Sequence, residues 1–150
     1  MAEDFTFGDF SIGQTYQSRS IVIERDRIIS FGEEFDPRPQ HLSGQVAEAS
    51  AFGGLVASGW HTGAVSMRLY TEAMPPIAGG GQGAGLEGLV WPQPVRPGDA
   101  IRVTVEIVEK RQSRSRADRG IVKFAAITRN QRDEVVQSVT HVVIVPIRRS

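Results

Sequence analysis

The sequence predicts a single α+β domain, residues 1–150, in which a curved antiparallel sheet wraps one long apolar helix. Three observations predict it. The 150 residues fit one domain with a sizeable core. Residues 58–74 form a proline-free segment of small and apolar residues, typical of a buried helix. After residue 85, apolar and polar residues alternate along most of the chain, as they do in strands.

The segment before the long helix is expected to hold a strand and two helices. Residues 15–24 contain three consecutive β-branched residues and predict a strand. Residues 24–35 carry apolar residues at helical spacing among charges, and Pro37 forbids further helix. Residues 43–50 are rich in alanine and begin with a serine that can cap a short helix.

The long helix is bounded by clear signals. Ser58 can cap its start, and the two prolines at 75–76 end it. Trp60 and Met67 fall on one face, with small residues nearly all round. We therefore expect this helix to be buried.

Four strands are expected after the long helix. The glycine-rich residues 78–85 read as a flexible connection, because they lack the Lys-Ser/Thr ending of a phosphate loop. Residues 86–95, 99–110, 120–130 and 134–147 alternate apolar and polar side chains and are separated by turn-forming residues. They predict an antiparallel meander.

Charge and cysteine content limit the function. Lys plus Arg and Asp plus Glu each number 17, so no global field draws the chain onto nucleic acid or an anionic membrane. A small-molecule partner is expected instead. The chain has no cysteine, which excludes disulfides and thiolate metal sites. The acidic N-terminus and the lack of an apolar run of about 20 residues lead us to expect a soluble, cytoplasmic protein.

The segment FDPRPQH, residues 35–41, places an acid and an imidazole around two prolines. Fully extended, the step from Asp36 to His41 spans roughly 16 Å, so the two side chains converge only if the loop curls. On spacing alone, a local turn bond for Asp36 and a packing role for His41 are favoured. The other histidines favour structural roles: His61 bonding a loop carbonyl at the helix start, and His141 on one face of the last strand.

The segment FGGLVASGWH places glycines before and just inside the long helix. The backbone N–H groups of Ser58, Gly59 and Trp60 could therefore meet a ligand, and a helix N-terminus is a suitable oxyanion site. An equally good interpretation is that Gly59 merely permits close packing.

Together these two segments resemble the MaoC-like dehydratase family, which includes the (R)-specific enoyl-CoA hydratases of hot-dog fold. Asp36, Pro39 and His41 match the D-x-N-P-x-H signature of those hydratases, and Phe52 and Gly59 fall where the later motif of the family would have them. The stretches VRPGD and RSRADRGIVKF also resemble the turn and hairpin that follow in that family.

The resemblance implies reversible addition of water to the double bond of a 2-enoyl-CoA-type thioester. Asp36 would hold the water, His41 would act as general base, and the N–H of Gly59 would meet the charge on the thioester oxygen. No metal and no cofactor are implied beyond coenzyme A as part of the substrate. The family also implies a homodimer with the site near the subunit interface.

One departure and several candidate contacts bear on the substrate. Arg38 stands where the family has Asn, and it could face solvent or a substrate carboxylate. Core packing is the plainer role for Trp60 and Met67, and a solvated hairpin tip explains Arg114 and Arg116 at least as well. The candidate substrate-binding residues are Arg38, Phe52, Ser58, Trp60, Met67, Arg114 and Arg116.

Two other functions remain open at this point. Hydrolysis of a thioester on the same fold would use Asp36 and water against the carbonyl carbon. A catalytically inactive acyl-CoA-binding homologue would keep the fold, with Arg38 as the sign of lost activity.

Overall fold

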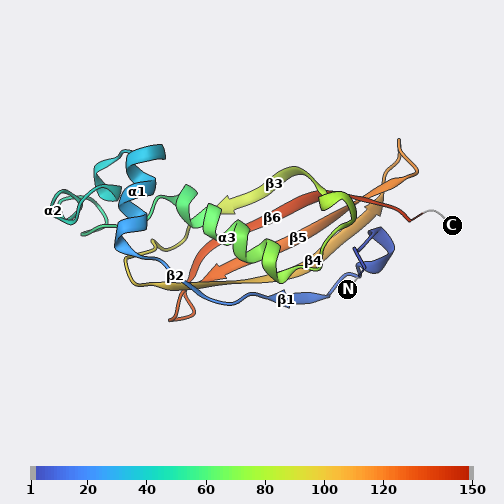
Figure 1. The fold of residues 1–150 in the computed structure, drawn as a ribbon, viewed down its shortest axis with the longest axis horizontal. Helices are drawn as coiled ribbons and strands as arrows, with labels where there is room; N and C mark the ends of the chain where they lie inside the picture. The colour runs from blue at the N-terminus through green and yellow to red at the C-terminus, as the bar shows by residue number, and fades with distance from the viewer. Residues whose placement is uncertain (1–2, 149–150) are drawn as a thin grey trace.

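The computed structural model describes residues 3–148 and consists of one sheet, one long helix and several short helices (Figure 1). The helical elements are η1 (Phe7–Asp9), α1 (Arg25–Phe35), η2 (Pro39–His41), α2 (Gly44–Ala47), α3 (Gly59–Ala73) and η3 (Ala78–Gly80). The strands are β1 (Thr15–Gln17), β2 (Ile21–Val22), β3 (Gln82–Val90), β4 (Ala100–Gln112), β5 (Arg119–Arg129) and β6 (Val135–Pro146).

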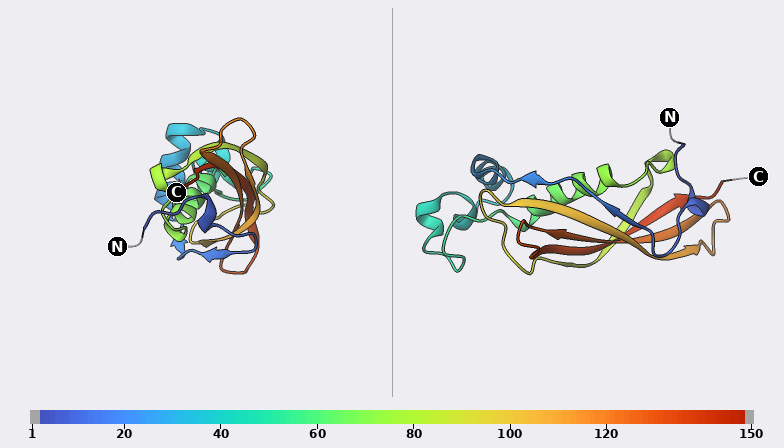
Figure 2. Two further views of the ribbon diagram at one scale, coloured as in Figure 1. Left: turned by 90° about the vertical axis from the view of Figure 1, so that its right-hand side faces the viewer. Right: turned by 90° about the horizontal axis from the view of Figure 1, so that it is seen from below.

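The six strands form one antiparallel sheet in the order β1-β4-β5-β6-β3, with β2 also pairing with β4. Figure 2 shows this sheet curving around α3. Within residues 3–148, β3 pairs only with β6, so β3 is an edge strand. The predicted α+β arrangement of a sheet wrapped around a central helix is confirmed. The expected meander holds for β4, β5 and β6 and is wrong for the strand before them, because β3 pairs with β6 and not with β4.

The core lies between α3 and the concave face of the sheet. In β5, Val122, Phe124 and Ala126 are buried and alternate with half-buried neighbours, as expected for a strand with one face on the core. Leu69 of α3 is completely buried, as is Phe124, which contacts Tyr70 of α3 edge to face. Burial of each such large side chain contributes about 1.5–3 kcal/mol, so this seam fixes α3 against the sheet.

The long helix is less buried than its composition predicts. The buried residues of α3 are His61, Thr62, Ser66 and Leu69; Ser66 contacts Thr128 of β5, and His61 stacks on Phe31 of α1. Trp60 and Met67 lie on the flank of α3 toward β3 and are 61% and 45% exposed. The expectation of a buried helix is therefore met on only part of α3 in the single chain, because the face that carries Trp60 and Met67 is left uncovered.

Several other element boundaries differ from the predictions. The strand expected at 15–24 is split into β1 and β2, and the helix expected at 43–50 is limited to α2. The glycine-rich connection at 78–85 contains η3 and the first residues of β3, held by pairing with β6. The strand expected to reach residue 95 ends at Val90, because Pro92 and Pro94 cannot donate to a sheet ladder. Residues 91–94 instead form a loop beside the start of α3.

Helices α1, η2 and α2 gather at one end of the sheet, where α3 begins (Figure 1). Helix α1 and η2 pack together there, and both termini lie toward the other end. Within residues 3–148, no helix combines the length and apolar character needed to cross a bilayer.

Candidate active site

The loop after α1 curls and brings Asp36 against His41. Asp36 ends α1, and its backbone N–H donates to the carbonyl of Gly32 at 3.0 Å. Pro39 then opens η2, and the His41 N–H donates to the carbonyl of Arg38 at 2.9 Å. As a result His41 Nε2 lies 3.3 Å from Asp36 Oδ2. The pairing that spacing alone disfavoured is therefore present in the structure.

A glycine in α1 makes this curl possible. A Cβ on Gly32 would lie 2.6 Å from the carbonyl oxygen of His41, closer than non-bonded atoms approach. Only glycine lets η2 pack this tightly on α1. The FDPRPQH motif thus depends on a residue four positions before Asp36, which sequence inspection did not single out.

The position of His41 determines which ring nitrogen can act as a base. His41 is 3% exposed, and its Nδ1 lies 2.7 Å from the carbonyl oxygen of Val56. A carbonyl only accepts, so Nδ1 carries the proton of the neutral ring. Nε2 then carries the lone pair, on the side of the ring toward Asp36, so Nε2 is the nitrogen that could take a proton from a water placed between the two side chains.

Asp36 is held as a carboxylate by three hydrogen bonds. Arg38 donates from Nε to Oδ1 at 2.7 Å and from Nη2 to Oδ2 at 2.8 Å. Ser58 Oγ donates to Oδ2 at 2.7 Å. The hydrogen bonds from Arg38 are the largest cause that holds the pKa of Asp36 well below its usual range, and the Ser58 hydroxyl lowers it further. Asp36 therefore stays ionised at neutral pH.

Arg38 lies directly across the acid and the imidazole. Its Nη2 is 2.8 Å from Asp36 Oδ2 and 3.5 Å from His41 Nε2. A water bonded to both groups would lie about 2.8 Å from each atom, so Nη2 occupies much of the same place. The side chain of Arg38 is 62% exposed overall, although its guanidinium is paired.

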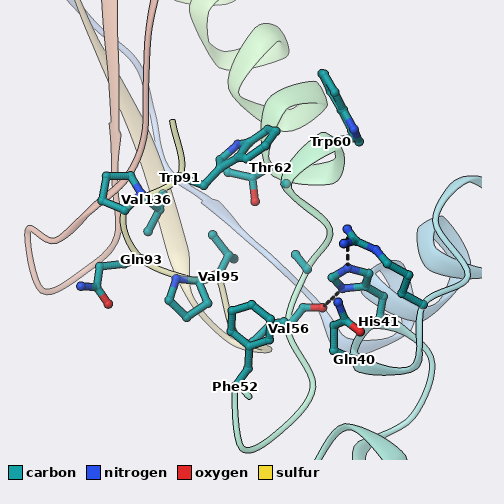
Figure 3. A pocket seen from close by; sticks show the side chains of 15 residues that line it. Gln40, His41, Phe52, Val56, Trp60, Thr62, Trp91, Gln93, Val95 and Val136 are labelled. Carbon is teal, nitrogen blue, oxygen red and sulfur yellow. Dashed lines mark hydrogen bonds between the residues drawn. The ribbon is translucent and has the colours of Figure 1, made fainter. Parts of the chain in front are cut away.

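His41 and Arg38 border a cavity of about 370 Å³ (Figure 3), and Asp36 lies behind them, outside the lining. Figure 3 shows His41 on one side of it, with Trp91 and Val136 across from the imidazole. Proline, valine and aromatic side chains make up much of the wall. The lining residues are Arg38, Gln40, His41, Phe52, Val56, Ala57, Gly59, Trp60, Thr62, Trp91, Pro92, Gln93, Pro94, Val95 and Val136.

Ser58 and Gly59 connect the cavity to α3. Ser58 caps the helix by accepting from the Trp60 N–H at 3.3 Å, as its sequence position predicts. Gly59 is the first helical residue, and its N–H has no acceptor within the helix. A Cβ on Gly59 would lie 2.7 Å from the ring of Trp91. The close-packing interpretation of Gly59 is thus confirmed, and its role as an oxyanion donor stays a prediction.

Sequence inspection missed Trp91, because it was assigned to a strand. Its indole packs on Gly59, meets Trp60 edge to face at 5.5 Å, and donates from Nε1 to Gln137 at 2.9 Å. The signal was the sequence WPQP at residues 91–94, in which two prolines close behind Trp91 favour a rigid loop over a strand.

Of the remaining predicted contacts, two line this cavity and three lie away from it. Phe52 and Trp60 line it, but Met67 lines a separate groove with Leu86 and Leu89. The hairpin that joins β4 to β5 carries Arg114 and Arg116, and it lies at the end of the sheet opposite α1 and α2 (Figure 1). A single chain therefore does not bring these arginines to Asp36 and His41.

The other two histidines are buried against aromatic rings. His61 stacks on Phe31 at 4.9 Å, and its Nδ1 has no partner in the part of the chain that the structure describes. His141 stacks on Tyr70 at 4.3 Å. Burial lowers the pKa of both imidazoles. Among residues 3–148 no group of three or more His, Cys, Asp or Glu could hold a metal ion.

Comparisons with known proteins give the family. Residues 9–130 match the MaoC like domain. The uncharacterized protein YdeM of Bacillus subtilis (strain 168) is 32% identical over 127 residues, covering 83% of this chain and 87% of YdeM. A solved MaoC-like dehydratase from Rhodospirillum rubrum is 44% identical with a TM-score of 0.91, over 97% of this chain and 99% of that one.

A more distant structure shares the fold. The unliganded R-hydratase PhaJ1 from Pseudomonas aeruginosa is 23% identical with a TM-score of 0.77, over 97% of this chain and 88% of that one. The sheet wrapped around α3 is thus the hot-dog fold that the motif resemblance implies. The chain belongs to the MaoC-like dehydratase family.

Proposed function

We propose that the protein reversibly adds water to the double bond of a 2-enoyl-CoA thioester. The observation that carries the proposal is the orientation of His41, whose Nδ1 is bonded to the Val56 carbonyl and whose Nε2 faces the ionised Asp36 beside a cavity. The similarity to proteins named as a dehydratase and an R-hydratase supports the same chemistry.

In the hydration direction, a water held by Asp36 and His41 attacks C3 of the substrate. A bond forms between the water oxygen and C3, and one water proton passes to His41 Nε2. The electron pair of the C2–C3 double bond moves toward the thioester, and its oxygen gains negative charge. His41 then returns the proton to C2, directly or through Asp36, so that the product gains one H and one OH.

The developing oxyanion is expected to meet the N–H of Gly59. This group begins α3, a helix of 15 residues, and the positive end of a helix favours negative charge. One oxyanion donor contributes roughly 3 kcal/mol to stabilising such a transition state. Coenzyme A enters as part of the substrate, and the mechanism uses no other cofactor.

We also propose that the active form is a homodimer. Several large apolar side chains are exposed on α3, on β3 and just after β3: Trp60, Met67, Leu86, Val90 and Trp91. The outer edge of β3 offers unpaired backbone groups, as edge strands do. A second copy applied to this face would cover both the apolar side chains and the strand edge.

Hydration can be followed directly from the ultraviolet absorbance of the conjugated thioester. The assay compares the wild type with Asp36→Asn and His41→Ala on straight-chain, branched and dicarboxylic enoyl-CoAs. Both variants should lose at least about a hundredfold in kcat/KM, whereas Arg19→Gln, which removes an exposed ion pair with Glu72, should retain activity.

The same samples separate the alternatives. Release of free thiol in place of a hydroxyacyl product would show a thioesterase. Calorimetric binding of acyl-CoA with no turnover of any substrate would show an inactive homologue. If both active-site variants kept full hydratase activity, the roles of Asp36 and His41 would be wrong.

A further inference from the structure

Arg38 occupies the place where the proposed reaction needs its water. Its Nη2 lies 2.8 Å from Asp36 Oδ2 and 3.5 Å from His41 Nε2. The Asp36 Oδ2 atom also accepts from Ser58 at 2.7 Å, which leaves this oxygen with little capacity for another donor. Hydration therefore requires the guanidinium to leave the carboxylate.

The side chain of Arg38 is free to move. It is 62% exposed, and exposed ion pairs contribute little to stability. The flanking Pro37 and Pro39 restrict the backbone, so the displacement is a rotation of the side chain and not a movement of the loop. What is missing in the free protein is another acceptor for the guanidinium.

The described lining of the cavity offers no charged acceptor for the guanidinium. Among its described lining residues there is no aspartate and no glutamate, and Arg38 is the only lysine or arginine. The polar groups that accompany it are His41, Thr62 and the amides of Gln40 and Gln93. In the single chain, an anion that enters this cavity would find Arg38 as the one lysine or arginine of the described lining, and Arg38 is also the residue that blocks the water position.

We propose that the substrate is a 2-enoyl-CoA whose acyl group carries a second carboxylate, and that this carboxylate draws Arg38 away from Asp36. The inference rests on the proposed function and names its substrate class. Because Arg38 Nη2 lies within 3.5 Å of the reacting groups, the carboxylate belongs about one to three carbons beyond C3 at a C–C step of roughly 1.5 Å. Arginine binds a carboxylate through two parallel hydrogen bonds.

The exchange is balanced in hydrogen bonds. Arg38 gives up two bonds to Asp36 at 2.7 and 2.8 Å and regains two on the substrate. The carboxylate of Asp36 then accepts from the incoming water. A substrate that ends in a methyl group provides no second acceptor, so Arg38 either stays on Asp36 or leaves it for solvent. The carboxylate of an acidic substrate therefore binds Arg38 and also frees the water position beside Asp36.

The test compares two pairs of substrates matched in length: glutaconyl-CoA with trans-2-pentenoyl-CoA, and trans-2-hexenedioyl-CoA with trans-2-hexenoyl-CoA. For the wild type, kcat/KM should be higher for the acidic member of at least one pair by about tenfold to a hundredfold, the discrimination that hydrogen bonds to a charged group supply. Arg38→Gln should remove this preference by slowing the acidic substrate and leaving the neutral one equal or faster.

Two further variants separate charge from geometry. Arg38→Lys keeps the charge without the paired donors and should retain only part of the preference. Arg19→Gln removes an arginine of similar exposure that pairs with Glu72 away from the cavity lining, and it should leave the preference unchanged. Circular dichroism of each variant checks that the fold is intact.

The outcomes distinguish this inference from the proposed function. Equal kcat/KM for acidic and neutral substrates in the wild type, with no change in Arg38→Gln, would overturn the inference while hydration stands. The same holds if Arg38→Gln slows both members of a pair equally, because that result assigns the guanidinium to a common group such as coenzyme A. If neither the wild type nor Arg38→Gln hydrates any of the four substrates, the proposed function fails as well.

Discussion

Ser58 joins the fold to the chemistry, and its replacement tests both. Its Oγ donates to Asp36 Oδ2 at 2.7 Å and accepts from the Trp60 N–H at 3.3 Å, and the residue is 1% exposed. Ser58→Ala removes the cap of α3 and one of the three hydrogen bonds that hold the carboxylate. Both losses should appear in the free energy of unfolding.

The magnitude follows from the two contacts. Loss of a serine N-cap costs about 0.5–2 kcal/mol, and the 3.3 Å distance places Ser58 toward the lower half of that range. A hydrogen bond to a charged group contributes about 1.5–3 kcal/mol, toward its lower end here because Arg38 still holds Asp36. We therefore expect Ser58→Ala to lower the free energy of unfolding by about 2–3 kcal/mol.

A double-mutant cycle isolates the bond to the carboxylate. Urea unfolding at neutral pH is measured for the wild type, Ser58→Ala, Asp36→Asn and the double variant. The two changes should be non-additive by at least about 1 kcal/mol, since residues in contact couple and distant ones add within about 0.3–0.5 kcal/mol. Ser58→Ala combined with Asp133→Asn, an exposed carboxylate paired with Arg102, provides the additive control.

The pH dependence of the free energy of unfolding supplies a second test. The folded-state pKa of Asp36 is lowered, so its stabilising contribution is present above the unfolded pKa of about 3.9 and is lost as the pH falls toward the folded value. Without the Ser58 hydroxyl the folded-state pKa is lowered less, while the unfolded-state pKa is the same in both proteins. The cost of Ser58→Ala should therefore stay constant as the pH falls to about 3.9 and shrink only at lower pH, as the pH passes through the folded-state pKa of the variant. Additive unfolding energies, or a cost that already falls between pH 7 and pH 4, would refute the reasoning.

Three other predictions concern the site and its surroundings. Arg38→Gln removes the largest cause of the low Asp36 pKa, so the acid limb of the pH profile of kcat/KM should move to higher pH, since hydration needs the ionised carboxylate. Gly59→Ala places a Cβ about 2.7 Å from the Trp91 ring. It should destabilise the fold, and Trp91→Ala in the same chain should recover stability in urea unfolding. Leu86→Arg adds a charge to an apolar side chain that is 52% exposed on β3. It should convert a dimer to a monomer in light scattering while circular dichroism is unchanged, whereas a wild type that is already monomeric would contradict the proposed dimer.

Periodicity predicted most of the fold because each buried strand has one face on the core. The segments expected at 99–110, 120–130 and 134–147 become β4, β5 and β6 with shifts of only a few residues. One error occurs where a single chain does not decide burial. The small residues of α3 suggested a core helix, yet its Trp60 face is open in the single chain.

The candidate site was predicted in part. The motif and its resemblance led to Asp36 and His41, but spacing alone pointed to structural roles, since no local signal showed that the loop curls. The curl depends on packing against Gly32, and the tautomer of His41 depends on the Val56 carbonyl, 15 residues away. Contacts of this range follow from the assembled fold and not from the residues of the motif.

The two prolines that first suggested a rigid turn give Arg38 its role. With the backbone fixed on both sides, the guanidinium and a water compete for the same side of Asp36 and His41. The site is closed when Arg38 is bonded to Asp36 and open when a water takes its place. Change between the two then requires only the rotation of an exposed side chain, and such rotations occur in picoseconds to nanoseconds. Such a step is far too fast to limit turnover, so Arg38 should act on kcat/KM through the population of the open site and the affinity for the substrate, and not as a slow gate.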